Sequence, residues 1–298
     1  MRTLFFDRDN RLRNGWWVLI FVVFIAITRV VHKPVLDALK GLNVHDAWRQ
    51  PLPVVFALLV TWACTRLRRQ PLSSVGFQLD RRWMKEFAAG TLLGGVAIVL
   101  AAMMIWVAGS VRFELDPARS VGALGYGLYV FFFAALLEEI LFRGFVFQRL
   151  LDGIGVWGAQ LTLAALFVVA HWENPGMEGA TRLWASIDIG LAAVLLGLAY
   201  VRTRSLALPL GLHLGWNWVQ GHVLGFGVSG FDHSGWLRPV FNGQPAWLSG
   251  GEFGPEASVL GVLTDLIMIG LLWQWRGTAA NRVSKQHEAA YVLVHSRE

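Results

Sequence analysis

The sequence predicts an all-α membrane protein, a polytopic bundle of about eight transmembrane helices with both termini on the cytoplasmic side. Composition is the first reason: 55% of the 298 residues are hydrophobic and only 15% are charged, with a mean hydropathy of +0.49. The second reason is that basic residues gather in alternate loops between apolar segments. Because little polar sequence is left for a soluble domain, we expect one integral-membrane domain over residues 1–298.

Eight apolar segments account for the predicted helices. A transmembrane helix needs about 20 residues, and fewer where it crosses a thin region. The segments are 16–31, 52–65, 87–109, 122–148, 157–172, 185–201, 205–224 and 258–275. No small-residue cleavage site follows the first segment, so we expect a retained helix rather than a signal peptide. Cys64 is the only cysteine, and its apolar surroundings indicate a packing role.

The basic residues orient this bundle. They are concentrated before residue 14, between 66 and 85, at 202–204 and after 275, whereas the alternate loops hold fewer. Lys and Arg prefer the cytoplasmic side, which predicts cytoplasmic termini and a polar cytoplasmic tail at 276–298. In a bacterium this multi-pass protein would lie in the plasma (inner) membrane. The same bias explains the net charge of +6, so we expect the lipid bilayer, and no nucleic acid, as a partner.

Two adjacent glutamates interrupt the fourth segment, in the run YGLYVFFFAALLEEILFRGFVF. A carboxylate inside a membrane costs several kcal/mol, so such a residue indicates a functional site. At about 100° per residue, Glu139 and Arg143 share a helix face one turn apart, which predicts a structural ion pair. Glu138 lies about 100° away and is left to face a cavity as an acid or base. The alternative is that both glutamates only connect helices by hydrogen bonds.

Two later segments carry polar pairs with the same i, i+4 spacing. Phe167 and His171 end the fifth segment, and His213 and Asn217 lie in the seventh. Alone, His171 is typical of an interfacial histidine, and His213 with Asn217 is typical of hydrogen bonds between helices. At 1.5 Å per residue, Glu138, His171 and His213 all fall near the middle of the membrane, where one cavity could hold them.

A shared cavity would suit hydrolysis. A carboxylate in apolar surroundings can act as a general base near neutral pH. One histidine can position the attacking water or protonate the leaving amine, and a second histidine with an Asn amide can donate to the developing oxyanion. Glu138, His171 and His213 could instead hold a divalent metal such as zinc. The His-Glu-x-x-His motif is absent and Asn is a poor zinc ligand, so the cofactor stays open.

Together these motifs resemble the CPBP family of intramembrane proteases, which includes the CAAX prenyl endopeptidases and the bacterial Abi or bacteriocin-processing proteins. The family pattern is Glu-Glu-x-x-x-Arg, then Phe-x-x-x-His, then His-x-x-x-Asn. In this chain the three motifs are Glu138-Glu139-Ile-Leu-Phe-Arg143, Phe167-Val-Val-Ala-His171 and His213-Leu-Gly-Trp-Asn217. Each motif alone is weakly specific, whereas their order on consecutive membrane segments is specific. The resemblance places a catalytic core at about 122–224.

The resemblance implies an intramembrane endopeptidase that cleaves membrane-associated proteins or peptides. Glu138 would activate water, His171 and His213 would position it, and Asn217 would help to form the oxyanion hole. The remaining motif residues, Glu139, Arg143 and Phe167, would have supporting roles. The family is usually described as metalloproteases, although a metal-free glutamate mechanism has also been argued for its members. Nothing in the sequence indicates whether a substrate would be prenylated.

Two other functions compete with this interpretation. The chain could be a non-enzymatic immunity or scaffold protein of the same family, or a proton-coupled transporter that uses the buried carboxylates. Transporters often show inverted repeats or paired broken helices. The sequence shows neither, which favours the protease. The Gly-rich and aromatic-rich loop at 225–256 is expected to form either an extracytoplasmic lid or re-entrant segment that shapes the cavity, or a plain connector.

Overall fold

The computed structural model describes residues 2–279, and this part of the chain is mostly helical, as predicted. Residues 280–298, which form most of the predicted cytoplasmic tail, lie outside the described part. The α-helices are α1 (Arg2–Phe5), α2 (Asn14–Gly41), α3 (Asp46–Arg49), α4 (Pro51–Leu67), α5 (Arg81–Val107), α6 (Val121–Glu139), α7 (Phe145–His171), α8 (Gly179–Thr203), α9 (Ala207–Trp218), α10 (Ala246–Ser249) and α11 (Val259–Gln274).

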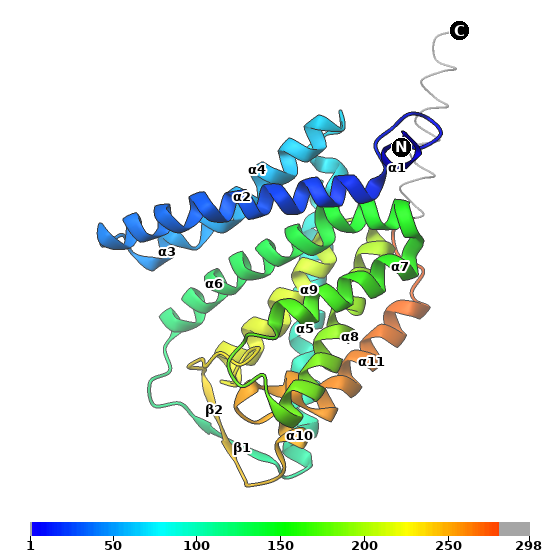
Figure 1. The fold of residues 1–298 in the computed structure, drawn as a ribbon. Helices are drawn as coiled ribbons and strands as arrows, with labels where there is room; N and C mark the ends of the chain where they lie inside the picture. The colour runs from blue at the N-terminus through cyan, green and yellow to red at the C-terminus, as the bar shows by residue number, and fades with distance from the viewer. Residues whose placement is uncertain (1, 280–298) are drawn as a thin grey trace.

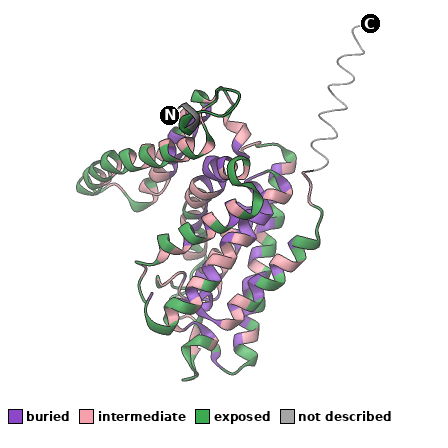
Figure 2. Cartoon of the chain, turned by 45° about the vertical axis from the view of Figure 1, so that its right-hand side comes forward, coloured by how far each residue is buried: buried purple, intermediate pink, exposed green. Residues whose placement is uncertain are grey.

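The long helices form a bundle with an arm on one side (Figure 1). Helices α5, α8, α9 and α11 pack together, and α6 and α7 lie along them. Helix α2 lies across one end of the bundle, where Phe21 stacks on Phe145 of α7 with ring centroids 5.6 Å apart. Beyond this contact, α2 and α4 extend to the side as a pair of helices, of which α2 is the more exposed (Figure 2). Cys64 of α4 is fully buried, as its apolar surroundings predicted.

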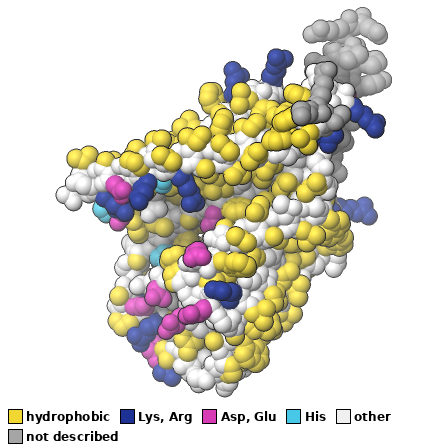
Figure 3. Space-filling model, in the orientation of Figure 1, with side chains coloured by type: hydrophobic (Ala, Val, Ile, Leu, Met, Phe, Trp, Pro, Cys, Tyr) yellow, Lys and Arg dark blue, Asp and Glu magenta, His cyan; other side chains and the backbone are white. Residues whose placement is uncertain are grey.

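The outer surface of the bundle is largely apolar. Four helical stretches are long and apolar enough to cross a membrane: Asn14–Gly41, Asp46–Leu67, Arg81–Val107 and Gly179–Thr203. Large hydrophobic side chains are exposed along them, and they cover much of the face seen in Figure 3. A soluble monomer rarely exposes contiguous apolar patches of this kind. The composition and the surface therefore agree that this is an integral membrane protein.

Helices α5 and α9 approach each other closely through glycines. Gly90 and Gly94 on α5 face Gly211 and Gly215 on α9, each pair in G-x-x-x-G spacing. A Cβ atom at Gly94 would lie 2.1 Å from the carbonyl oxygen of Leu212, and one at Gly215 would lie 2.0 Å from that of Thr91. Small residues at this spacing let two membrane helices pack backbone to backbone. This contact sets the position of α9, which carries two of the predicted site residues.

The helix boundaries differ from the prediction around the glutamates. Segments 122–148 and 157–172 were expected as two separate helices, and the helical backbone does break between them, at Gly155. The first of the two is itself interrupted, because α6 ends at Glu139, one π-helical turn follows at Ile140–Gly144, and α7 begins at Phe145 and ends at His171. Gly155 has φ 74° and ψ 179°, a conformation open mainly to glycine. A second π-helical turn, Val219–Val223, follows α9.

The all-α prediction was wrong in one detail, because two short strands pair. Strand β1 (Val111–Leu115) runs antiparallel to β2 (Leu237–Phe241), with Val111 opposite Phe241. Arg238 donates to Glu114 across the pair. The loop at 225–256 therefore contains β2, α10 and two 3₁₀ turns, Gly251–Phe253 and Pro255–Ala257. Elsewhere in the chain, a further 3₁₀ turn, Leu72–Val75, precedes α5. Pairing between strands more than 100 residues apart leaves no local signal in the sequence.

The glycine contact between α5 and α9 gives a stability prediction. Gly215→Ala adds a methyl group where no space exists, so we expect it to lower the melting temperature in detergent, with a cost of about 1–3 kcal/mol. Gly270→Ala on α11 is the matched control, because a Cβ atom there meets nothing within 4 Å. Equal melting temperatures for the two variants would contradict the close packing described here.

Candidate active site

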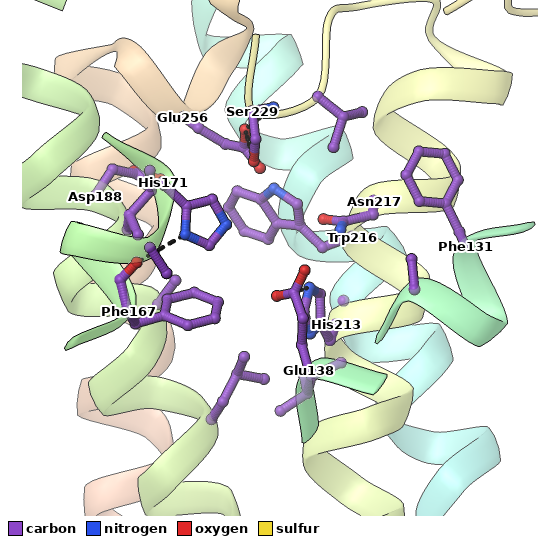
Figure 4. A pocket seen from close by; sticks show the side chains of 18 of the residues that line it. Phe131, Glu138, Phe167, His171, Asp188, His213, Trp216, Asn217, Ser229 and Glu256 are labelled. Carbon is purple, nitrogen blue, oxygen red and sulfur yellow. Dashed lines mark hydrogen bonds and ion pairs between the residues drawn. The ribbon is translucent and has the colours of Figure 1, made fainter. Parts of the chain in front are cut away.

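One cavity of about 720 Å³ collects most of the residues that the motifs singled out. Its walls include Glu138 of α6, Phe167 and His171 of α7, and His213 and Asn217 of α9 (Figure 4). The loop that follows α9 closes part of the cavity, since residues 228, 229 and 231–233 also line it. The loop therefore shapes the cavity and is more than a plain connector. Whether it moves as a lid stays a prediction.

Glu139 and Arg143 lie behind the cavity wall rather than on it. Both side chains are fully buried, and Arg143 Nη1 donates to Glu139 Oε1 over 3.1 Å. Arg143 Nη2 also donates to the carbonyl oxygen of Ala193 on α8. The ion pair predicted from the i, i+4 spacing is therefore present. The side chain of Glu138, by contrast, is 32% exposed and faces the cavity.

The two glutamate side chains point to different surroundings at the place where the helix changes from α-helical to π-helical geometry. The π-helical turn at Ile140–Gly144 begins directly after Glu139. Such turns are rare and often occur at functional sites. The second π-helical turn begins two residues after Asn217. Both motif-bearing helices therefore change geometry next to the cavity, which a constant rotation of 100° per residue does not predict.

His213 lies between the two carboxylates. Its Nδ1 is 3.0 Å from Glu139 Oε1, and its Nε2 is 3.7 Å from Glu138 Oε2. Because a carboxylate accepts, Nδ1–H donates to Glu139 and Nε2 is presented toward Glu138 and the cavity. Glu139 thus accepts from both Arg143 and His213. The sequence interpretation missed the second of these contacts, because 74 residues separate the partners.

Phe167 fixes the other side of the cavity. His171 Nδ1 lies 2.7 Å from the carbonyl oxygen of Phe167, so it donates there and leaves Nε2 free for the cavity. The Phe167 ring lies 4.6 Å from the His171 ring and 6.5 Å from the His213 ring, measured between centroids. The guanidinium carbon of Arg143 lies 4.7 Å from the same ring. Phe167 therefore separates the two histidines and covers the buried cation.

The described residues do not fit the metal site that the family resemblance raised. Glu138 and His213 come close to each other, but no group of three or more His, Cys, Asp or Glu side chains in residues 2–279 gathers as metal binding requires. A zinc site needs three or four protein ligands around one point.

Four further carboxylates line the cavity and were missed from the sequence. They are Asp188 of α8, Asp232 in the loop after α9, Glu256 in the 3₁₀ turn before α11, and Asp265 of α11. Burial raises the pKa of the Glu256 carboxyl, while hydrogen bonds from the backbone and hydroxyl of Ser229 act in the opposite direction. Asp188 and Asp265 lie inside the apolar segments 185–201 and 258–275. The criterion that selected Glu138, an ionisable residue in an apolar run, would have found both.

The buried ion pair gives a second stability prediction. Arg143→Met leaves Glu139 buried without its cation, so we expect a loss of about 3–5 kcal/mol, read as a lower melting temperature in detergent. The double variant Glu139→Gln with Arg143→Met removes both charges and should recover part of that loss. Arg66→Met, at an exposed position near the end of α4, is the control. An unchanged melting temperature for Arg143→Met would show that the pair contributes nothing.

Comparison with known proteins agrees with the motifs. The family described as "Type II CAAX prenyl endopeptidase Rce1-like" matches residues 120–219, which contain Glu138, His171, His213 and Asn217. No curated protein matches the chain. No solved structure matches it either. The match over residues 120–219 thus confirms the resemblance to the CPBP/CAAX protease family that the three motifs predicted. It supports an intramembrane protease at the level of the family.

Proposed function

We propose that this protein is an intramembrane endopeptidase that hydrolyses peptide bonds of membrane-associated proteins or peptides with a water activated by Glu138. The observation that carries the proposal is the division between the adjacent glutamates. Glu139 is fully buried against Arg143 and His213, whereas Glu138 faces the cavity that also contains His171 and Asn217. A general base must be open to the water it deprotonates, and of the two only Glu138 is.

In the proposed mechanism each of these side chains has a role. Glu138 takes a proton from water, and the water oxygen attacks the carbonyl carbon of the scissile peptide bond. The C–N bond then breaks as the proton is delivered to the leaving amine. Asn217 donates a hydrogen bond to the oxyanion. His171 holds the water, because its Nδ1–H donates to Phe167 and leaves Nε2 as an acceptor that faces the cavity. Glu139 is a positioning residue, because it accepts from His213 Nδ1 and so directs Nε2 toward Glu138.

The same proposal includes the membrane arrangement. The four helical stretches that satisfy length and composition would be joined by α6, α7, α9 and α11 to give about eight membrane crossings. The concentration of basic residues in alternate loops supports a cytoplasmic position for both termini. The catalytic core at 122–224 would then lie within one membrane domain, with loop 225–256 on the opposite side of the bilayer, and the bacterial location would be the plasma (inner) membrane.

The cavity suits substrates that reach it from the bilayer. Arg29 of the α2 arm lines the cavity, and the hollow beneath this arm is visible in Figure 3. Apolar side chains such as Leu195, Leu196 and Met268 form much of the wall. We propose that a hydrophobic peptide segment, or a prenylated chain end of the kind named for the matching family, enters below the arm.

Glu138→Gln tests the proposed base. The amide keeps the shape of the side chain but cannot take a proton, so peptide cleavage by the protein in liposomes should fall by about 10²–10⁴-fold. The melting temperature should stay unchanged, because Glu138 is not part of the buried ion pair. Glu173→Gln, at an exposed glutamate just after α7, is the matched control. Cleavage by Glu138→Gln at the wild-type rate would refute the mechanism, whereas no cleavage by the wild type of any peptide would favour a non-enzymatic membrane protein.

Asn217→Ala tests the oxyanion contact. Removing one such donor costs about 10²–10³ in kcat, and we expect a loss of that size with little change in KM. Asn217→Asp should be similarly impaired, because the carboxylate accepts rather than donates. A loss confined to KM would instead assign Asn217 to substrate binding.

A further inference from the structure

A second polar region lies in the same cavity, away from Glu138. Glu256 and Ser229 are at one end, Glu138 and His213 are at the other, and His171 and Trp216 lie between them (Figure 4). Asp188 and Asp265 also line the cavity. These three carboxylates come from α8, α11 and the turn before α11, so three separate elements converge on one region. We call Asp188, Glu256 and Asp265 the acidic end of the cavity.

The acidic end has unmet hydrogen-bonding capacity. Asp188 is 2% exposed and Asp265 is 1% exposed, and one carboxylate oxygen of each, Oδ1 and Oδ2 respectively, is buried without a partner. Buried polar atoms almost always have a partner, so these two oxygens indicate one that residues 2–279 do not supply. No Lys or Arg among residues 2–279 forms an ion pair with any of the three carboxylates.

Glu256 is the member of this group that is held in place. It is 7% exposed, and its Oε2 accepts from both the backbone N–H and the hydroxyl of Ser229. Those two bonds fix the carboxylate at the cavity wall. A carboxylate fixed by its own neighbours can meet a charged group without first losing side-chain entropy.

The chemistry of the missing partner follows from this arrangement. The three carboxylates do not gather as a metal site in the described part of the chain. A guanidinium or ammonium group carries five or three donors, which can reach carboxylates that are spread over several elements. The long apolar stem of such a side chain would pack on the neighbouring wall, where Leu195 and Met268 lie.

We propose that the acidic end is a substrate subsite that binds a lysine or arginine side chain of the peptide, with Glu256 as the contacting residue. This inference rests on the proposed protease function, and it adds a preference for a basic residue near the scissile bond. Asp188 and Asp265 contribute further carboxyl oxygens from deeper positions. The subsite would also supply hydrogen-bond acceptors to a basic side chain in a cavity whose walls are largely apolar.

A binding experiment tests the subsite without catalysis. The probe is n-hexylguanidinium, and n-hexylurea is its neutral counterpart of similar shape. We expect the cation, but not the urea, to raise the melting temperature of both the wild type and Glu138→Gln, and Glu256→Gln to lose this response. Glu252→Gln, at an exposed glutamate of the same loop, should keep it. An equal response to the two probes in the wild type, or an unaltered response in a folded Glu256→Gln, would overturn the inference.

A peptide-cleavage assay then tests this inference independently of the proposed function. Peptides that differ only by lysine or norleucine, scanned over the positions around the scissile bond, should show a preference for lysine at one position. We expect that preference to be about tenfold or more in kcat/KM, and Glu256→Gln to abolish it, the size expected for loss of a charged hydrogen-bond partner. Asp188→Asn should weaken the preference while keeping the Ser229 bonds, which covers the case that Glu256→Gln does not fold.

The outcomes of the two experiments are distinct. Cleavage without any lysine preference, and without stabilisation by the cation, would refute the subsite and leave the protease proposal standing. Stabilisation by the cation with no cleavage of any peptide would refute the protease proposal and leave a cation-binding cavity. A lysine preference that persists in a folded Glu256→Gln would assign recognition to other residues.

Discussion

The burial of charge inside an apolar helix bundle is the constraint on which this site depends. Arg143 is fully buried, and its donors reach Glu139 on α6 and the carbonyl oxygen of Ala193 on α8. Glu139 also accepts from His213 on α9. Leaving either charge alone would be costly, so three helices are held in one arrangement by the need to satisfy these groups. The cavity forms beside this network, with Glu138 as the carboxylate that the network does not use.

Close backbone packing supplies the second part of the scaffold. The glycines of α5 and α9 allow the two helices to approach without side chains between them, which fixes the depth and rotation of α9. His213 and Asn217 then project into the cavity from a helix that cannot shift. Phe167 completes the arrangement from α7, because one ring contacts both histidines and also covers Arg143. A site built on rigid helices in this way is positioned before a substrate arrives.

The cavity has chemically different ends. At one end, Glu139 is paired with Arg143 and His213, and the neighbouring Glu138 carboxylate faces the cavity. At the acidic end, carboxylates are gathered with no Lys or Arg of the described chain paired to them. Loop 225–256 separates this end from the outside through residues that follow the second π-helical turn and precede α11. Under the two proposals made above, the same enclosure would hold a water for hydrolysis at one end and a substrate side chain at the other.

The sequence alone determined the features that depend on local spacing. Apolar segments predicted most of the helices, and the i, i+4 spacing of Glu139 and Arg143 predicted their ion pair, because both signals lie within a few residues. The three motifs also predicted the family resemblance. Only the tertiary structure decided how these pieces meet: the contact of His213 with Glu139, the paired strands β1 and β2, and the convergence of Asp188, Glu256 and Asp265. The π-helical turns also escaped prediction, since packing selects them from conformations that the local sequence leaves open. Contacts between residues far apart in the chain depend on how helices pack, and no local period in the sequence records that packing.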